Sequence, residues 1–150
     1  MRIIIQRVVK ASVTIDEKKY SSIAQGFMVL LGIENEDTLD DIMWLCEKLI
    51  SLRVFKDAEG MLNLNIQQIN GEILIVSQFT LYASTKKGNR PSFTKAAKPE
   101  VAIALYEKFI SEIEKLIGKA CKTGLFGANM QIELINDGPV TLILDSKNKE

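Results

Sequence analysis

The order of the periodic segments constrains the fold of this chain most strongly. Apolar residues recur at helical spacing in two segments, 38–50 and 99–116, and the other apolar segments are short enough for strands. The strand-like segments do not alternate regularly with the helices, which argues against a doubly wound parallel sheet. The pattern predicts an α+β fold: a strongly curved, barrel-like, mainly antiparallel β-sheet with two main helices on one side.

Strand signals lie on both sides of the predicted helices. Asn70-Gly71 is the strongest hairpin signal, and Asn136-Asp137-Gly138-Pro139 is predicted to be a turn between two strands. The predicted strands cover residues 2–15, 27–33, 73–79, 130–135 and 140–144.

Both predicted helices have terminal signals. Thr38 can cap the first helix, Pro99 can occupy the first turn of the second, and Gly118 lies just past its end. These signals fix where each helix should begin and the second should stop.

A chain of 150 residues suits one domain, which we expect to span residues 1–145, followed by the polar tail 146–150. The apolar run Ile3-Ile4-Ile5 is shorter than the roughly 7–15 residues of a signal-peptide core, and no stretch reaches the roughly 20 residues of a membrane span. We therefore expect a cytoplasmic protein with no membrane partner. Because the formal net charge is zero, binding to nucleic acid would need a local basic patch.

The chain contains no histidine. This excludes Ser-His-Asp and Cys-His catalysis, and with them the zinc sites built on histidine. Cys46 and Cys121 are isolated and form no Cys-x-x-Cys pair, and Cys46 lies on the apolar stripe of the first helix. We expect neither a metal nor a cofactor, and any catalysis must proceed without imidazole.

The segment Ser77-Gln78-Phe79-Thr80-Leu81 places polar side chains where an apolar strand ends. Backbone amides freed at a strand end can point at a substrate oxygen, although an ordinary strand end has the same pattern. Thr80 would need an adjacent base to act as a nucleophile, and the sequence indicates none. The pattern therefore favours a Thr80 that hydrogen-bonds over one that reacts covalently.

A basic segment follows. Five cations and no acidic residue lie between Thr85 and Lys98, with Phe93 among them. Such a loop suits phosphate contacts and base stacking, but a solvated lysine-rich loop has the same composition. Gly124-Leu125-Phe126-Gly127 is a weaker candidate for a stacking platform, and the alternative is a turn with a core Phe.

The pair Gly138-Pro139 lacks both a side chain on glycine and an N–H on proline. It can therefore present bare carbonyl oxygens at a fixed angle. A tight connection between two strands would have the same sequence. X-Pro bonds are cis in only about 5–6% of cases, so the sequence leaves the isomer open.

Taken together, these segments resemble the D-aminoacyl-tRNA deacylase family. The similarity runs in order along nearly the whole chain, and Ser77-Gln78-Phe79 is typical of the D-specific branch, whereas a sibling family has Pro-Gln-Ala there. It is carried by Gln6-Arg7-Val8, Ala11-Ser12-Val13, Asp57-Ala58-Glu59-Gly60, Ser77–Leu81, Arg90-Pro91-Ser92-Phe93 and Asn136–Thr141.

The resemblance implies a homodimer with active sites at the subunit interface. A cis Gly138-Pro139 pair would reach into the partner's pocket, hold the substrate amino group and Cα, and exclude an L side chain. Ser77, Gln78 and the backbone N–H of Phe79 would surround the scissile ester, with Thr80 supporting them. Other residues would act around this centre: Phe126 and Met130 at the terminal adenosine, and Arg7 as a brace for the Gly-Pro pair.

The activity implied is hydrolysis of the ester bond of D-aminoacyl-tRNA; the sequence leaves open whether glycine on a non-cognate tRNA is also a substrate. The 2′-hydroxyl of the terminal ribose would help activate water, so no side-chain nucleophile is needed. Two other functions remain open from the sequence. One is a non-catalytic RNA-binding module using the 86–98 loop; the other is an editing domain that clears mischarged L-amino acids.

Overall fold

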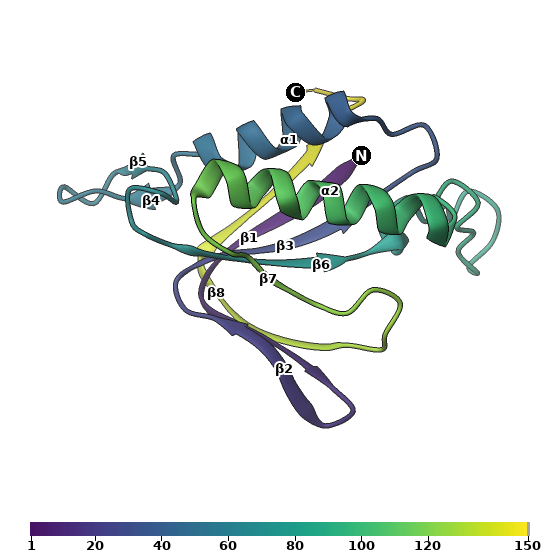
Figure 1. Ribbon diagram of the computed structural model, residues 1–150, viewed down its shortest axis with the longest axis horizontal. Coiled ribbons are helices and arrows are strands. Elements are labelled where there is room, and N and C mark those ends of the chain that lie inside the picture. Colours follow the sequence, from purple (N-terminus) through teal and green to yellow (C-terminus); the bar gives the residue numbers. More distant parts are fainter. Residues whose placement is uncertain (150) are drawn as a thin grey trace.

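The computed structural model describes residues 1–149. It has one main curved sheet, with both long helices on the same side (Figure 1), and a separate two-stranded sheet. The strands are β1 (Arg2–Ile15), β2 (Lys18–Ile23), β3 (Gly26–Gly32), β4 (Phe55–Lys56), β5 (Leu62–Leu64), β6 (Glu72–Ser77), β7 (Lys122–Thr123) and β8 (Gln131–Asp145). The helices are α1 (Leu39–Ser51), the 3-10 helix η1 (Phe79–Tyr82) and α2 (Pro99–Ile117).

Strand β1 is the centre of the sheet. It pairs antiparallel with β3 through its first half, with β2 through its second half, and with β8 along nearly its whole length. Two further pairs, β3–β6 and β6–β7, are parallel. The parallel β3–β6 pair exists because α1 lies in the connection between these strands, as a crossover requires. The predicted α+β, barrel-like fold is confirmed, with a sheet that is mixed.

The two helices cover one face of the sheet and contact each other (Figure 1). Their buried faces follow the predicted helical spacing: Ile42, Leu45, Cys46, Leu49 and Ile50 in α1, and Ala102, Tyr106, Phe109 and Ile113 in α2. Both predicted helix starts are confirmed, at Thr38 and Pro99, and α2 ends on Gly118 in the left-handed conformation at φ 75°. The main core thus lies between the helices and the inner face of β1, β3 and β6.

Three strand predictions need correction. Residues 131–145 form one continuous strand, β8, with irregular pairing to β1 around Asn136–Thr141, so Gly138-Pro139 lies within a strand and does not join two. Asn70-Gly71 is a turn with Asn70 at φ 52°, but no hairpin forms there because β6 pairs with β3 and β7. The predicted strand over 73–79 ends at Ser77, where η1 takes over.

The two ends of the described chain lie together. The α-amino group of Met1 pairs with buried Asp37 and donates to Ser146 Oγ at 2.9 Å. Lys147 binds Asp41 at 2.8 Å, so the first residues of the predicted tail pack on the fold, while Glu150 is outside the described residues. Within residues 1–149, no helix is long and apolar enough to cross a membrane.

Candidate active site

The polar segment after β6 is held at the end of the sheet. Ser77 pairs with Leu31 of β3, and the backbone N–H of Gln78 donates to the Leu31 carbonyl at 2.8 Å. The chain then turns into η1, which begins at Phe79. A helix leaves its first N–H groups without intrahelical partners, so the Phe79 amide is placed to donate outward. The Phe79 N–H is therefore a candidate donor to a ligand, and its role stays a prediction.

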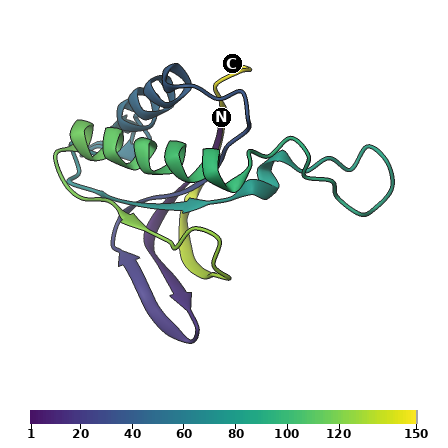
Figure 2. The ribbon, with the colours of Figure 1, turned by 45° about the vertical axis from the view of Figure 1, so that its right-hand side comes forward.

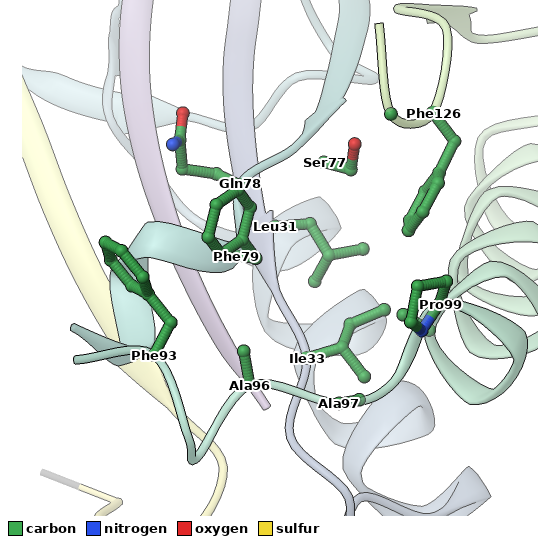
Figure 3. A pocket seen from close by; sticks show the side chains of 12 residues that line it. Leu31, Ile33, Ser77, Gln78, Phe79, Phe93, Ala96, Ala97, Pro99 and Phe126 are labelled. Atoms are coloured by element: carbon green, nitrogen blue, oxygen red, sulfur yellow. The ribbon is translucent and has the colours of Figure 1, made fainter.

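A cavity of about 380 Å³ opens beside this segment (Figure 3). Leu31 and Ile33 lie at its base, Phe79 and Phe93 on one side, and Phe126 and Pro99 on the opposite side. Its walls are mostly apolar, with Ser77 and Gln78 as the polar residues. An apolar slot between aromatic rings, with a few polar groups at one end, suits a planar base.

A second, smaller cavity of about 220 Å³ meets the first. The two share Ser77, Gln78, Phe79 and Gly127, but Met130 lines only the smaller one and Phe126 only the larger one. The predicted site residues Phe126 and Met130 therefore line different cavities, which share the Ser77–Phe79 segment. A ligand that spans both cavities would have its middle at this segment.

Gln78 and Thr80 contact each other. The Gln78 side-chain amide donates to the Thr80 hydroxyl oxygen, a bond that removes no proton from the hydroxyl and so does not activate it. Thr80 does not line the larger cavity. It lies instead beside a separate surface hollow, together with Ile4, Leu81 and Ile143.

The Gly138-Pro139 pair lies elsewhere in the chain. Its peptide bond is cis, and both residues are exposed to solvent. Arg7, only 4% exposed, holds the preceding residue: its Nε lies 3.0 Å from the Asp137 carboxylate and donates to the Asp137 carbonyl at 3.2 Å. The Arg7 guanidinium also donates to the Val54 carbonyl. Arg7 of the same chain thus holds the segment that carries the Gly138-Pro139 pair, and the other side of the pair is exposed to solvent.

The register of the sheet separates this pair from the cavities of its own chain. Thr141 is level with Gln6, Gln6 with Met28, and Met28 with Leu74. The path from Thr141 to Gln78 therefore crosses three spacings between strands, from β8 to β6, and then runs four residues along the chain, from Leu74 to Gln78. With about 4.8 Å per spacing and about 3.3 Å per residue, Thr141 and Gln78 are roughly 20 Å apart. Within one chain the two predicted halves of the site do not meet.

The cavities contain no titratable side chain, so neither acid nor base catalysis by a side chain is available there. The two thiols lie in the core or against it, and burial raises the pKa of both, that of Cys121 to about 12. Within residues 1–149, no cluster of three Cys, Asp or Glu side chains could hold a metal ion.

Several residues that support the site were not predicted from the sequence. A Cβ on Gly32 would lie 2.9 Å from Leu81 Cβ, so glycine lets η1 approach β3. A Cβ on Gly124 would lie 2.4 Å from Met130 Sδ, which shows that glycine makes room for Met130. Arg2 fixes the end of η1 by donating to the Leu81 carbonyl at 2.8 Å. A lone glycine or a strand arginine has many uses, so the sequence alone could not single these out.

Comparison with known proteins gives a consistent result. The family model described as D-Tyr-tRNA(Tyr) deacylase matches residues 4–145. The "D-aminoacyl-tRNA deacylase" of Flavobacterium psychrophilum is 57% identical over 150 residues, 100% of both chains, and that of Cytophaga hutchinsonii is 58% identical over 98% of each chain. A solved structure titled "c-Myc DNA Unwinding Element Binding Protein" has a TM-score of 0.92 at 41% identity, covering 97% of this chain and 98% of that one.

A second solved structure supports the fold alone. It is titled as a probable eukaryotic D-amino acid tRNA deacylase and has a TM-score of 0.82 at 20% identity. It covers 95% of this chain and 97% of its own.

Proposed function

The chain belongs to the D-Tyr-tRNA(Tyr) deacylase family, and from that premise we propose that it hydrolyses the ester bond of D-aminoacyl-tRNA, releasing the free D-amino acid and tRNA. One observation carries the proposal: two cavities meet at Ser77-Gln78-Phe79. The aminoacyl end of a tRNA has the same layout, with a planar base on one side of an ester and an amino-acid side chain on the other. The enzyme is a carboxylic ester hydrolase, and the ester would lie at the shared segment.

The chemical step would rely on positioning and on backbone donors. Water attacks the ester carbonyl carbon, the Phe79 N–H stabilises the oxyanion that forms, and the bond to the ribose 3′-oxygen breaks as that oxygen takes up a proton. One such donor contributes about 2.7–4 kcal/mol in comparable sites. The 2′-hydroxyl of the same ribose would help activate the water, because neither cavity has a side chain that can act as a general base. Gln78 would place the ester, with Thr80 supporting Gln78.

The amino-acid end of the site would be completed by a second copy of the chain. Ile4 and Ile143 are paired across β1 and β8 on the outer face, and Ile143 is 66% exposed. This face is continuous with the hollow that contains Thr80. Two copies related by a twofold axis would bury the same strip on both sides. The exposed Gly138-Pro139 pair of one copy would then reach the Ser77–Thr80 segment of the other.

Selection of the D-enantiomer would come from the backbone of that Gly-Pro pair. Its two carbonyls would accept hydrogen bonds from the substrate amino group and occupy the space that an L side chain needs. A pocket that senses one methylene gives only about 1–3 kcal/mol of discrimination, whereas a fixed wall works by exclusion. Glycine has no side chain to exclude, so glycyl esters on non-cognate tRNA would also be substrates.

The tRNA partner also bears on where the enzyme works. An enzyme that clears D-aminoacyl-tRNA acts where tRNA is charged, and we assign it to the cytoplasm on that ground. The chain would contribute every group the reaction needs except the substrate's own hydroxyl, so no cofactor is part of the mechanism.

A deacylation assay tests the function. Purified protein is incubated with D-Tyr-tRNA, L-Tyr-tRNA and L-Ser-tRNA, and release of the amino acid is followed. The proposal predicts hydrolysis of the D-ester alone. Hydrolysis of L-Ser-tRNA would indicate the editing function, and salt-sensitive binding of tRNA without any cleavage would indicate an RNA-binding module.

A further inference from the structure

The segment 84–98 projects from the body of the molecule (Figure 2). Three of its residues, Phe93, Ala96 and Ala97, line the larger cavity. Its base is fixed, because Ser84 and Ser92 exchange two backbone hydrogen bonds of 2.8 and 2.9 Å. The Ala97 amide donates to the Ile33 carbonyl at 2.9 Å, which ties the end of the segment to the floor of the cavity. The segment is therefore a hairpin-like arm with an anchored base and an exposed tip, residues 85–91.

The charge of this arm has one sign. Its five cations are all exposed, and none of them takes part in an ion pair within residues 1–149; they are Lys86, Lys87, Arg90, Lys95 and Lys98. The whole chain has a net charge of zero, so the remaining residues carry the balancing negative charge. An unpaired positive arm on an otherwise acidic molecule fits a polyanion.

The base of the arm carries an aromatic side chain at the rim of the cavity. Phe93 lies edge-on to Phe79, with ring centroids 5.0 Å apart and an interplanar angle of 74°. The two rings are 37% and 58% exposed, so apolar surface faces solvent at this rim. Phe126 and Pro99 form the opposite wall (Figure 3). A single-stranded nucleic acid whose last base lies in the cavity, and whose chain leaves it on the Phe93 side, would pass directly onto the arm.

We infer that this arm holds the single-stranded end of the tRNA: Phe93 stacks on the base that precedes the terminal adenosine, and Lys86, Lys87 and Arg90 bind phosphates further along. The inference rests on the proposed function, since that places the terminal adenosine in the cavity. It adds a second contact region outside the cavity, one that recognises RNA without reading its sequence. The arm would raise the affinity for tRNA and leave the chemical step unchanged.

Two substrates separate the arm from the cavity. One is D-Tyr-tRNA, which can contact both, and the other is 2′(3′)-O-D-tyrosyl-adenosine, which ends at the cavity. In the triple variant Lys86→Gln/Lys87→Gln/Arg90→Gln we expect KM for D-Tyr-tRNA to rise at least tenfold with kcat unchanged. The slope of log KM against log salt should fall by about 2, because each lost phosphate contact on a single strand removes about 0.7. Hydrolysis of tyrosyl-adenosine should stay as in the wild type.

Replacing Phe93 tests the stacking contact. Phe93→Leu should raise KM for D-Tyr-tRNA about 5- to 150-fold, the range for loss of one stacked base. The rise in KM for tyrosyl-adenosine should be at least fivefold smaller, and Phe93→Trp should restore KM for D-Tyr-tRNA to the wild-type value.

The matched control for the triple charge variant is Lys18→Gln/Lys19→Gln/Lys56→Gln, which removes three exposed cations outside the arm. This control should change neither KM for D-Tyr-tRNA nor the slope of log KM against log salt.

The outcomes separate the two claims. Wild-type protein that hydrolyses neither D-ester contradicts the proposed function and the inference with it. The inference alone is wrong if the wild type is active but the arm variants keep the wild-type KM and salt slope. It is also wrong if the arm variants lose activity on D-Tyr-tRNA and on tyrosyl-adenosine to the same extent.

Discussion

Arg7 Nε lies 3.0 Å from the carboxylate of Asp137, the residue that precedes the solvent-exposed Gly138-Pro139 pair. The arginine is 4% exposed and the aspartate 41%. A Cβ on Gly138 would lie 2.8 Å from Arg7 Nη2, so the guanidinium also packs behind the glycine. Arg7 therefore positions the pair without being able to contact a substrate itself.

The first prediction concerns this arginine. Arg7→Met keeps an unbranched, flexible side chain, although a shorter one, and removes every hydrogen bond to Asp137 and Val54. We expect a folded protein whose preference for D-Tyr-tRNA over L-Tyr-tRNA falls at least tenfold, measured as the ratio of kcat/KM values. Asp137→Asn is the control. It keeps the bond to the Asp137 carbonyl and loses a half-exposed ion pair worth about 0–1 kcal/mol, so the ratio should change less than threefold. Equal effects of the two variants would contradict the positioning role.

The second prediction concerns the outer face of β1 and β8. Ile143→Glu would place a charge at the centre of the proposed dimer contact, which an apolar interface core does not tolerate. We expect sedimentation to show a monomer, with hydrolysis of D-Tyr-tRNA reduced at least a hundredfold. Met61→Glu, at another exposed apolar residue in the β4–β5 connection, should remain dimeric and active. A fully active Ile143→Glu monomer would refute the composite site.

The third prediction concerns Thr80. Because its hydroxyl accepts a hydrogen bond from Gln78 and has no base to deprotonate it, Thr80→Ala should lower kcat less than about tenfold, and neither the wild type nor the variant should accumulate a burst-phase acyl-enzyme. Removal of a true nucleophile costs on the order of 10⁶ in kcat in a serine protease. A loss above a thousandfold, in a variant with unchanged circular dichroism, would assign Thr80 a covalent role.

The fourth prediction concerns acid stability. Burial alone would raise the pKa of Asp41, but hydrogen bonds from Lys147, Ser146 and Thr38 outweigh it and hold the pKa below its usual range. A lowered folded-state pKa gives stability that is present above the unfolded value of about 3.9 and is lost as pH falls through the folded value. Asp41→Asn should therefore lower the free energy of unfolding by about 1–2 kcal/mol at pH 7, and by less at pH 2.

Asp40→Asn is the control for that measurement, because Asp40 lies in the same first turn of α1 but is exposed. Its unfolding free energy should stay within about 0.5 kcal/mol of the wild type at both pH values. A gap between Asp41→Asn and the wild type that widens at low pH would contradict the assigned role of the carboxylate.

Local signals predicted the parts of the fold that local physics decides. Thr38, Pro99 and Gly118 marked helix ends correctly, because capping and backbone conformation depend on a few neighbouring residues. The alternation over 2–15 predicted β1, whereas the strand predicted over 73–79 ran two residues past Ser77, where β6 ends.

Pairing partners were not predictable in the same way. Asn70-Gly71 carries a hairpin signal, yet the strand after it pairs with β3, which lies some 40 residues earlier in the chain. Asn136–Pro139 has the composition of a turn, but β1 pairs with β8 on both sides of residues 137–140, so the chain continues as one strand. The contacts that make Gly32, Gly124 and Arg2 important are likewise tertiary, so no sequence window contains them.

The most direct test of the composite site mixes two damaged chains. Gln78→Ala damages the cavity side, and Gly138→Ala damages the Gly-Pro side, since a Cβ there meets Arg7 and Val140 at φ 120°. Each homodimer should be at least a hundredfold less active on D-Tyr-tRNA than the wild type. After dissociation and random reassociation, half of the dimers are mixed, and each mixed dimer has one site built from two undamaged halves. We predict recovery of about a quarter of the wild-type activity; no recovery, with mixed dimers demonstrated by mass spectrometry, would show that each site is built from a single chain.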